Sequence, residues 1–191
     1  MMKKLSAVLM IAICVAAGFT AGFKTALVRE HNRLERNKQI LRRIHKEVWS
    51  NPDLNAALKA ADELYTPNFV VHDSTGDYNG LASRKKDIAE GRSAYPDYNE
   101  EVLDMFAESD VVVTRFLSTG TQKGDLAAIP GYQPLIPANC KPIRVPALAV
   151  HRLVNGRLAE QWEYSDNWLA NIQAGLIDPD KMSVAPAKAC R

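Results

Sequence analysis

The sequence predicts an α+β fold in which about three N-terminal helices pack on one strongly curved, mostly antiparallel sheet. Up to Pro96 the apolar residues recur mainly at helical spacing, and after it they alternate with polar residues as in β-strands. The strand half contains two hairpin-length turns, so its neighbouring strands pair antiparallel. Because one sheet must curl around the helices to bury both apolar faces, we expect a concave pocket that suits a small ligand.

The first 23 residues are predicted to be a leader and not part of the fold. Two lysines precede a charge-free run of 19 residues, Leu5 to Phe23, which is typical of a signal peptide or a single membrane anchor. Small residues near its end favour cleavage, whereas the basic residues that follow at once favour an anchor. We expect a periplasmic or secreted protein that contacts a membrane only through residues 5–23, if they are retained. The folded domain covers residues 30–177, and residues 178–191 form a flexible tail.

Three helices are predicted in the first half of the domain. The first covers about residues 30–49, where apolar residues recur every three or four positions. The second begins at Asn51, which we expect to cap it, with Pro52 in the first helical position. The third covers about residues 81–95 and ends at Pro96.

The strands are predicted from alternation and turn signals. FVVHD, at residues 69–73, is a short strand before a turn at Gly76–Gly80. Two hairpins follow; one turns at residues 108–110 and the other at Asn155-Gly156, the strongest two-residue hairpin signal in the chain. Residues 120–142 lie between the hairpins and contain four prolines, so we expect a strand stub and then a loop.

Charge and cysteine content limit the classes of function. The formal net charge of +2 is accounted for by Lys3 and Lys4, so the rest of the chain is neutral, which argues against a nucleic-acid partner. Outside the leader only Cys140 and Cys190 remain. Either they pair in an oxidising compartment or they are unrelated thiols. No cysteine or histidine spacing suggests a metal site.

The last strand ends in EQWEYSDNW, which places the carboxylate of Asp166 among three aromatic rings. Alternation puts Trp162, Tyr164 and Asp166 on one face, and because this face carries the large rings we expect it to point inward. A buried Asp166 would be a strong base, suited to proton abstraction. The alternative is that the strand ends near Ser165 and Asp166 caps a short helix.

Three further polar residues lie on predicted strands, each with a structural and a functional interpretation. His151 lies on an apolar face and is either a core histidine or part of the pocket. Arg115 lies among apolar residues and either pairs with Glu160 or Glu163 or meets a ligand. His72 either lines the pocket or solvates a strand end. No nucleophile elbow, phosphate loop or zinc motif is present, so the predicted chemistry is acid–base work without a cofactor.

Several of these features together resemble the SnoaL-like polyketide cyclases of the NTF2-like superfamily. The marks are His72 after an apolar strand, Gly80 before the third helix, Tyr95-Pro96-Asp97, the segments VVVTRFLSTGTQKG and NGRLAEQW, Asp166 four residues after Trp162, and the closing IQAGL. The resemblance covers about residues 38–177. It implies an NTF2-like cone of curved sheet closed by helices.

The resemblance also implies a site and a reaction. An aspartate at the position of Asp166 would remove a proton alpha to a carbonyl, and the carbanion would close a ring by aldol addition. His72, Arg115, Gln122 and Trp162 would shape or polarise the pocket. From the strand pattern, and not from the resemblance, His151 and Tyr164 are further pocket candidates. A homodimer through the open sheet face is a further expectation from the family.

One departure from the family pattern keeps a second hypothesis open. Gln122 stands where the family usually has His, and an amide can donate a hydrogen bond but cannot shuttle a proton near neutral pH. Two hypotheses therefore remain. The chain is an enzyme, either a cyclase, an isomerase or a hydrolase, that acts on a small apolar carbonyl compound. Alternatively, it is a non-catalytic protein whose pocket binds a small hydrophobic molecule.

Overall fold

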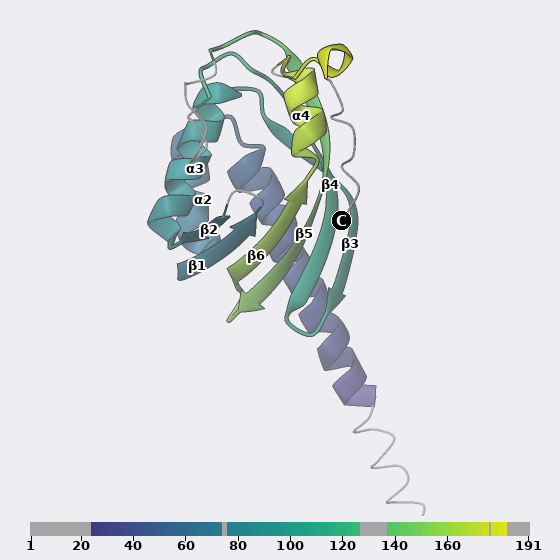
Figure 1. Cartoon of the computed structure of the whole chain (residues 1–191). Helices are drawn as coiled ribbons and strands as arrows, with labels where there is room; N and C mark the ends of the chain where they lie inside the picture. Colours follow the sequence, from purple (N-terminus) through teal and green to yellow (C-terminus); the bar gives the residue numbers. More distant parts are fainter. Residues whose placement is uncertain (1–23, 74–75, 127–136, 176, 183–191) are drawn as a thin grey trace, which may run out of the picture.

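The structure is a computed structural model that describes residues 24–73, 76–126, 137–175 and 177–182. Helices lie against one side of a single six-stranded sheet, and the sheet curves around them (Figure 1). The predicted α+β class with helices on a curved sheet is therefore confirmed. The sheet has more strands than the sequence indicated, and one strand pair is parallel.

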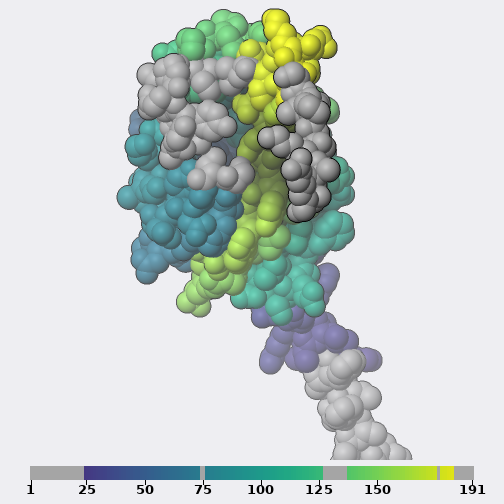
Figure 2. Space-filling model, viewed as in Figure 1, coloured from purple at the N-terminus to yellow at the C-terminus, as the bar shows by residue number. Residues whose placement is uncertain are grey.

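The first described helix covers residues 24–43 and continues into a wider π-helical turn, η1 (Ile44–Trp49). Its first ten described residues are mostly exposed, and the helix extends away from the body (Figure 2). Further along, Leu41, Ile44 and Val48 are buried, as the amphipathic pattern requires. Within the described residues no helix is long and apolar enough to span a membrane; residues 5–23 lie outside them.

Two more helices pack on the sheet, α2 (Leu54–Leu64) and α3 (Leu81–Ala94). The cap of α2 differs from the prediction, because Asp53 and not Asn51 holds that position. The carboxylate of Asp53 accepts hydrogen bonds from the backbone N–H groups of Asn55 and Ala56, at 2.9 and 3.1 Å. Asn51 lies two residues earlier, and its side-chain oxygen accepts a hydrogen bond from the backbone N–H of Asp53. The helix therefore starts two residues later than Pro52 suggested.

The sheet has the order β2-β1-β6-β5-β4-β3. Its strands are β1 (Tyr65–Asp73), β2 (Gly76–Asn79), β3 (Asn99–Glu108), β4 (Val111–Thr121), β5 (Pro142–Val154) and β6 (Arg157–Ser165). Strands β1 and β6 are parallel and the other neighbours are antiparallel. Both predicted hairpins are present; Asn155 and Gly156 have φ of 51° and 75°, the left-handed values that a tight two-residue turn needs.

The stretch predicted as a turn at Gly76–Gly80 is instead mostly strand β2, which pairs with β1 from Val70 to Asp73. The local sequence pattern predicted a turn here because the hydrogen bonds that make these four residues a strand come from the neighbouring strand β1. Its first residue, Gly76, has a φ of 131° that side chains other than glycine rarely adopt.

A β-bulge in β6 decides which side chains face inward. Leu158 pairs with Leu153, but Glu160 pairs with Arg152, so Ala159 is an extra residue without a partner in β5. An extra residue moves every later side chain to the opposite face of the sheet. From this point Gln161, Glu163 and Ser165 share the inner face, while Trp162 and Tyr164 lie on the outer one. The predicted alternation is therefore wrong beyond Ala159.

The chain after β4 is irregular at residues 122–125 and 137–141, as the prolines predicted; residues 127–136 lie outside the described part. A short helix, α4 (Asn167–Gln173), follows β6, and a 3₁₀ turn, η2 (Pro179–Lys181), ends the described chain. Cys140 is exposed, and Cys190 lies outside the described residues, so the expected choice between a disulfide and separate thiols stays open.

The main core lies between the helices and the inner face of the sheet. It includes Leu41 and Val48 of the first helical region, Leu64 of α2, Ile88 of α3 and Leu158 of β6. A smaller buried cluster, Phe116 with Ala147 and Ala149, covers the inner face of β4 and β5. The same two strands also carry the buried polar side chains of Thr114, Ser118 and His151.

Candidate active site

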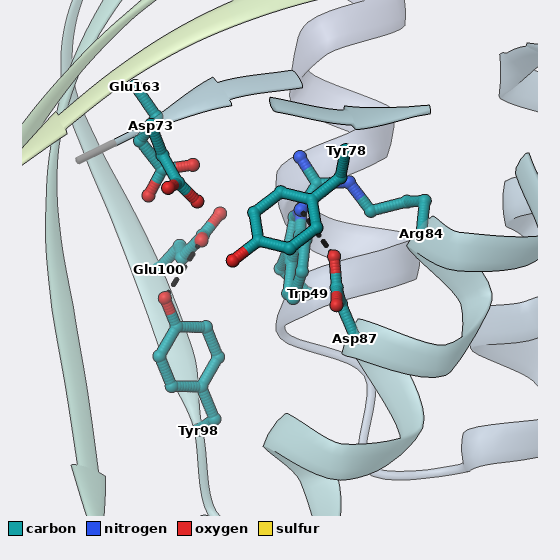
Figure 3. Close-up of a pocket in the computed structure, with 8 residues that line it drawn as sticks. All are labelled: Trp49, Asp73, Tyr78, Arg84, Asp87, Tyr98, Glu100 and Glu163. Atoms are coloured by element: carbon teal, nitrogen blue, oxygen red, sulfur yellow. Dashed lines mark hydrogen bonds and ion pairs between the residues drawn. The ribbon is translucent and has the colours of Figure 1, made fainter. Parts of the chain in front are cut away.

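A pocket with a volume of about 230 Å³ opens between η1, α3 and the inner face of the sheet. It is lined by aromatic and charged side chains: Trp49, Asp73, Tyr78, Arg84, Asp87, Tyr98, Glu100 and Glu163. Figure 3 shows the carboxylates of Asp73, Glu100 and Glu163 gathered on one side, with Arg84 and Asp87 on the other. The expected apolar pocket is therefore strongly polar. Its volume is below the roughly 300–1,000 Å³ of sites for drug-sized ligands.

Glu163 of β6 is the carboxylate best prepared to act as a base. Gln161 donates its side-chain amide to Oε2 at 2.7 Å, and the Ser165 hydroxyl donates to Oε1 at 3.1 Å. Burial raises the pKa of Glu163 above its ordinary value; the Arg84 charge opposes this rise and the Glu100 charge adds to it. A carboxylate taken from water is a stronger base, and two neighbouring donors keep it in one orientation.

Arg84, in the first turn of α3, is the one cation among the residues that line the pocket. Its side chain is 6% exposed, and its guanidinium carbon lies 5.0 Å from the Trp49 ring centroid and 5.1 Å from that of Phe69. Nη1 is 3.8 Å from a carboxylate oxygen of Asp87. Aromatic faces favour a cation in a dry site, so the positive charge is held in place beside the pocket.

Glu100 of β3 belongs to a second group of polar side chains. Its Oε2 lies 2.6 Å from Nδ1 of His45, in η1, and its Oε1 accepts a hydrogen bond from the Tyr98 hydroxyl at 3.0 Å. The same hydroxyl lies 2.9 Å from the Ser118 hydroxyl. Burial raises the pKa of Tyr98 well above its usual value, so Tyr98 keeps its proton and acts as a donor.

Asp166 does not point into this pocket. It is exposed and caps α4, where its carboxylate accepts a hydrogen bond from the backbone N–H of Leu169 at 2.9 Å. The expectation of an Asp166 buried among aromatic rings is therefore wrong, because the strand ends at Ser165 and the chain turns into a helix. Of the two interpretations of Asp166 given by the sequence, the geometry supports the cap. Whether it also contributes to catalysis is a prediction that only an activity measurement tests.

Four of the residues expected in the pocket lie on the outer face of the sheet. His72 contacts Asp77 at 2.8 Å and Glu160 at 3.1 Å and stacks on Trp162, with ring centroids 5.2 Å apart. Tyr164 is 66% exposed. Arg115 is exposed and its Nε donates to Asp104 at 2.7 Å, so it pairs with neither Glu160 nor Glu163.

His151 and Gln122 are buried, but neither lines the pocket. Nε2 of His151 lies 2.8 Å from the Thr114 hydroxyl, and burial lowers the pKa of His151 to about 3. His151 is thus the neutral core histidine of the structural interpretation. Gln122 donates its amide to the carbonyl oxygen of Pro137 at 3.2 Å and so holds the segment before β5 against the end of β4.

The residues that form the pocket were mostly missed by sequence reasoning. Glu163 was assigned to the outer face because the bulge at Ala159 leaves no clear mark in the sequence. One signal was available for His45, which lies on the apolar stripe of its helix, four residues after Leu41 and three before Val48. A polar residue on such a stripe needs a partner, and Glu100 is that partner.

Among the described residues no group of three or more histidine, cysteine, aspartate and glutamate side chains is arranged to hold a metal ion. Three of the pocket carboxylates, Asp87, Glu100 and Glu163, are instead paired with guanidinium, imidazole, hydroxyl or amide groups. The arrangement offers a base, a cation that can meet negative charge, and a proton donor, which together suit acid–base chemistry on a small molecule.

Comparisons with known proteins agree with this fold. A family model described as SnoaL-like polyketide cyclase matches residues 39–173. A proposed SnoaL-like polyketide cyclase from Jannaschia sp. CCS1 is 20% identical with a TM-score of 0.65, and the match covers 75% of this chain and 94% of that one. A proposed polyketide cyclase from Acidithiobacillus ferrooxidans is 27% identical with a TM-score of 0.61, over 74% and 95% of the two chains.

A third structure names the fold. A protein from Catenulispora acidiphila, described as having a ketosteroid isomerase-like fold, is 15% identical with a TM-score of 0.56 over 75% of this chain and 97% of that one. None of the curated proteins compared with the chain matches it.

Proposed function

The chain belongs to the SnoaL-like polyketide cyclase family, and from this premise we propose that it is an acid–base enzyme that removes a proton alpha to the carbonyl of a small molecule. Glu163 is the proposed base. The observation that carries the proposal is its position: Glu163 lies in the pocket on an inner strand, two side-chain donors hold it, and burial raises its pKa.

The proposed step moves one proton and one electron pair. The C–H bond next to the carbonyl breaks, its proton goes to the Glu163 carboxylate, and the electron pair moves onto the carbonyl oxygen as an enolate. Arg84 supports this step because a fixed cation in a water-poor site stabilises the charge that develops. The enolate then either adds to a second carbonyl and closes a ring, or takes a proton back at another carbon.

The lining supports a substrate that is small and carries polar groups as well as a flat or apolar part. Trp49, Tyr78 and Tyr98 offer ring faces, and the carboxylates accept hydrogen bonds from hydroxyl groups. This modifies the expectation of an apolar carbonyl compound. The family resemblance supports the reaction type, and the charges of the pocket support the polar character of the substrate.

The experiment that tests the proposal measures exchange of alpha protons for deuterium by NMR, with a set of small ketones and 1,3-dicarbonyl compounds in D₂O. Glu163→Gln keeps the shape and hydrogen-bonding length of the side chain but removes the base, so exchange should fall by about 100-fold or more. Asp166→Asn is the matched control, three residues further along, and should exchange at the wild-type rate.

The opposite result would overturn the assignment of the base. If Asp166→Asn loses exchange and Glu163→Gln keeps it, the role implied by the family resemblance is correct and the one argued from geometry is not. If the wild-type chain exchanges no compound, yet some of them raise its Tm, the chain is a binding module.

We also propose that the domain is exported, cleaved or tethered. The charge-free run from Leu5 to Phe23 after two lysines supports this. Fractionation of cells that express the full chain with a C-terminal tag, followed by intact-mass measurement, tests it. A periplasmic or membrane fraction is expected; a full-length chain in the cytosolic fraction would contradict it.

A further inference from the structure

We propose that His45 and Glu100 form a proton-holding pair beside the base, on the same side of the pocket, in which Glu100 meets the ligand and His45 supplies the proton from behind. The inference rests on the proposed function, since it names the acid that completes the reaction begun by Glu163. His45 does not line the pocket, so it is a positioning residue that acts through Glu100.

The pair is built by an unusual turn. The helix of residues 24–43 widens into the π-helical turn η1 where His45 lies, and the backbone N–H of Ser50 bonds the carbonyl oxygen of His45, five residues earlier, at 2.9 Å. π-Helical turns are rare and occur often at functional sites. The Ser50 hydroxyl also accepts from the backbone N–H of Glu100 at 3.0 Å. One turn therefore fixes both members of the pair.

The two side chains are buried together. Nδ1 of His45 lies 2.6 Å from Oε2 of Glu100, and each side chain is only 6% exposed. A buried carboxylate without a partner is costly, and so is a buried imidazolium. The pair is least costly when one proton lies between the two atoms, because neither side chain then carries an uncompensated charge. Tyr98 fixes the other oxygen, because its hydroxyl donates to Oε1.

The neighbouring His151 shows that a buried histidine needs a carboxylate partner in order to hold an extra proton. Its ring lies edge-on to that of His45, with centroids 6.2 Å apart, and it is equally buried. Its contact is the Thr114 hydroxyl, so burial keeps it neutral. The proton supply therefore ends at His45. The titratable and charged groups around the pair are Tyr65 of β1, Tyr98 just before β3, His151 of β5, Glu163 of β6, and Arg84 and Arg92 of α3.

The pair supplies the proton that the proposed aldol step requires at oxygen. Glu163 takes the proton from carbon, and the enolate carbon forms a bond to a second carbonyl carbon, which leaves an alkoxide. A proton passes from Nδ1 of His45 to Glu100, and the Glu100 carboxyl group gives a proton to the alkoxide oxygen. His45 ends neutral and Glu163 ends protonated, so one proton returned from Glu163 through the pocket restores the starting state. No oxidant, reductant or second substrate is required.

The first part of the test reads the pair without any substrate. In the full chain labelled with ¹⁵N-histidine, the proton on Nδ1 of His45 should give a far-downfield NMR signal, since it lies in a short hydrogen bond to a carboxylate. Glu100→Gln should abolish this signal, and Glu160→Gln, on the outer face, should not. Absence of the signal in the wild-type chain, or its survival in Glu100→Gln, overturns the proposal.

The second part separates the base from the acid. The probe is diacetone alcohol, whose cleavage to acetone reverses an aldol addition and needs both groups, while deuterium exchange into acetone needs only the base. His45→Asn keeps an N–H donor toward Glu100 but cannot release a proton. We expect cleavage to fall about 100-fold and its pH profile to change, with exchange retained. His72→Asn, the matched outer-face control, should behave as wild type.

The outcomes distinguish the two proposals. If Glu163→Gln abolishes exchange but His45→Asn leaves cleavage unchanged, the proposed function stands and the role of His45 is wrong. If Glu163→Gln leaves exchange intact, the assignment of Glu163 as the base is wrong, and the NMR signal still decides whether the pair exists. If His45→Asn does not fold, the wild-type signal and Glu100→Gln decide the question without it.

Discussion

The inner and outer faces of the sheet carry the same kinds of residue in opposite surroundings. On the inner side, His45 pairs with Glu100 next to Tyr98, and the side chains of both pair members are 6% exposed. On the outer face, His72 pairs with Glu160 next to Trp162, and these side chains are 29% and 20% exposed. Residue type alone therefore does not mark the site. What separates the two groups is how much water reaches them.

Two glutamates three residues apart, Glu160 and Glu163, show how these surroundings change the proton affinity of a carboxylate. Burial raises the pKa of Glu163, on the inner face. Hydrogen bonds from Arg152 and His72 hold the pKa of Glu160 below its usual value, on the outer face. The inner carboxylate is thus prepared to accept a proton, whereas the outer one is prepared to stay ionised.

The largest expected effect is on acid stability through the buried His151. Its folded pKa of about 3 lies below the ordinary value of about 6.5 in the unfolded chain. Between these values the unfolded chain binds the extra proton, so stability is lost as pH falls, by several kcal/mol. His151→Gln should reduce this loss of unfolding free energy at low pH, measured by urea unfolding from pH 3 to 7. An unchanged loss would contradict the buried neutral state.

His72 should show the opposite sign. Hydrogen bonds from His72 to Asp77 and then to Glu160 raise its pKa, so it contributes stability below about pH 6.5, and this contribution is lost as pH rises through the folded value. In the same experiment His72→Gln should lower stability at pH 5 and have little effect at pH 8.

Removing the histidine of each pair should lower stability by different amounts on the two faces of the sheet. His45→Leu leaves Glu100 buried without its partner and should lower the free energy of unfolding by about 3 kcal/mol at pH 7. His72→Leu removes a partly exposed contact and should cost less than about 1 kcal/mol. Equal losses in urea unfolding would mean that burial does not distinguish the two sites.

The two glutamates should respond in opposite directions at neutral pH. The raised pKa of Glu163 favours folding below about pH 4.5, and that advantage is lost as pH rises through the folded value. Glu163→Gln should therefore raise the free energy of unfolding at pH 7. Glu160 contributes stability above that pH, so Glu160→Gln should lower it by less than about 1 kcal/mol. The effect of the charge should vanish for both once the pH is low enough to protonate the two carboxylates.

The smallest effect is expected at Asp166. Asp166→Ala removes the cap of α4 and should cost about 1 kcal/mol or less, seen as faster hydrogen exchange in residues 167–173. Asp166→Asn caps nearly as well and should leave exchange almost unchanged. A loss in the Asn variant equal to that in the Ala variant would show that the charge of Asp166, and not its cap, matters.

Parts of the fold were predictable because their signals are local. The amphipathic stripe through Leu41 and Val48, the turn at Asn155-Gly156 and the end of α3 before Pro96 follow from neighbouring residues and are present in the structure. Strand β2 was missed because it is stabilised by hydrogen bonds to β1 and has little strand signal of its own. The predicted cap of α2, Asn51, was two residues too early, because several residues before α2 can cap a helix and the structure uses Asp53.

The site was less predictable than the fold. The sequence pointed to Trp162, Tyr164 and Asp166, and the structure places the two rings on the outer face and Asp166 at a helix cap. The bulge at Ala159 explains the first error, since it reverses the inward and outward positions for the rest of β6.

The sequence by itself determined the class of fold, the family and the kind of chemistry to expect, because hydrophobic period, turn residues and motif order are written along the chain. Only the tertiary structure decided which carboxylates face inward. That choice depends on strand register, on one unpaired residue in β6 and on a widened turn in the first helix, each of which is fixed by contacts between segments far apart in sequence. Burial then sets the proton affinity of each group, and burial is a property of the folded chain alone.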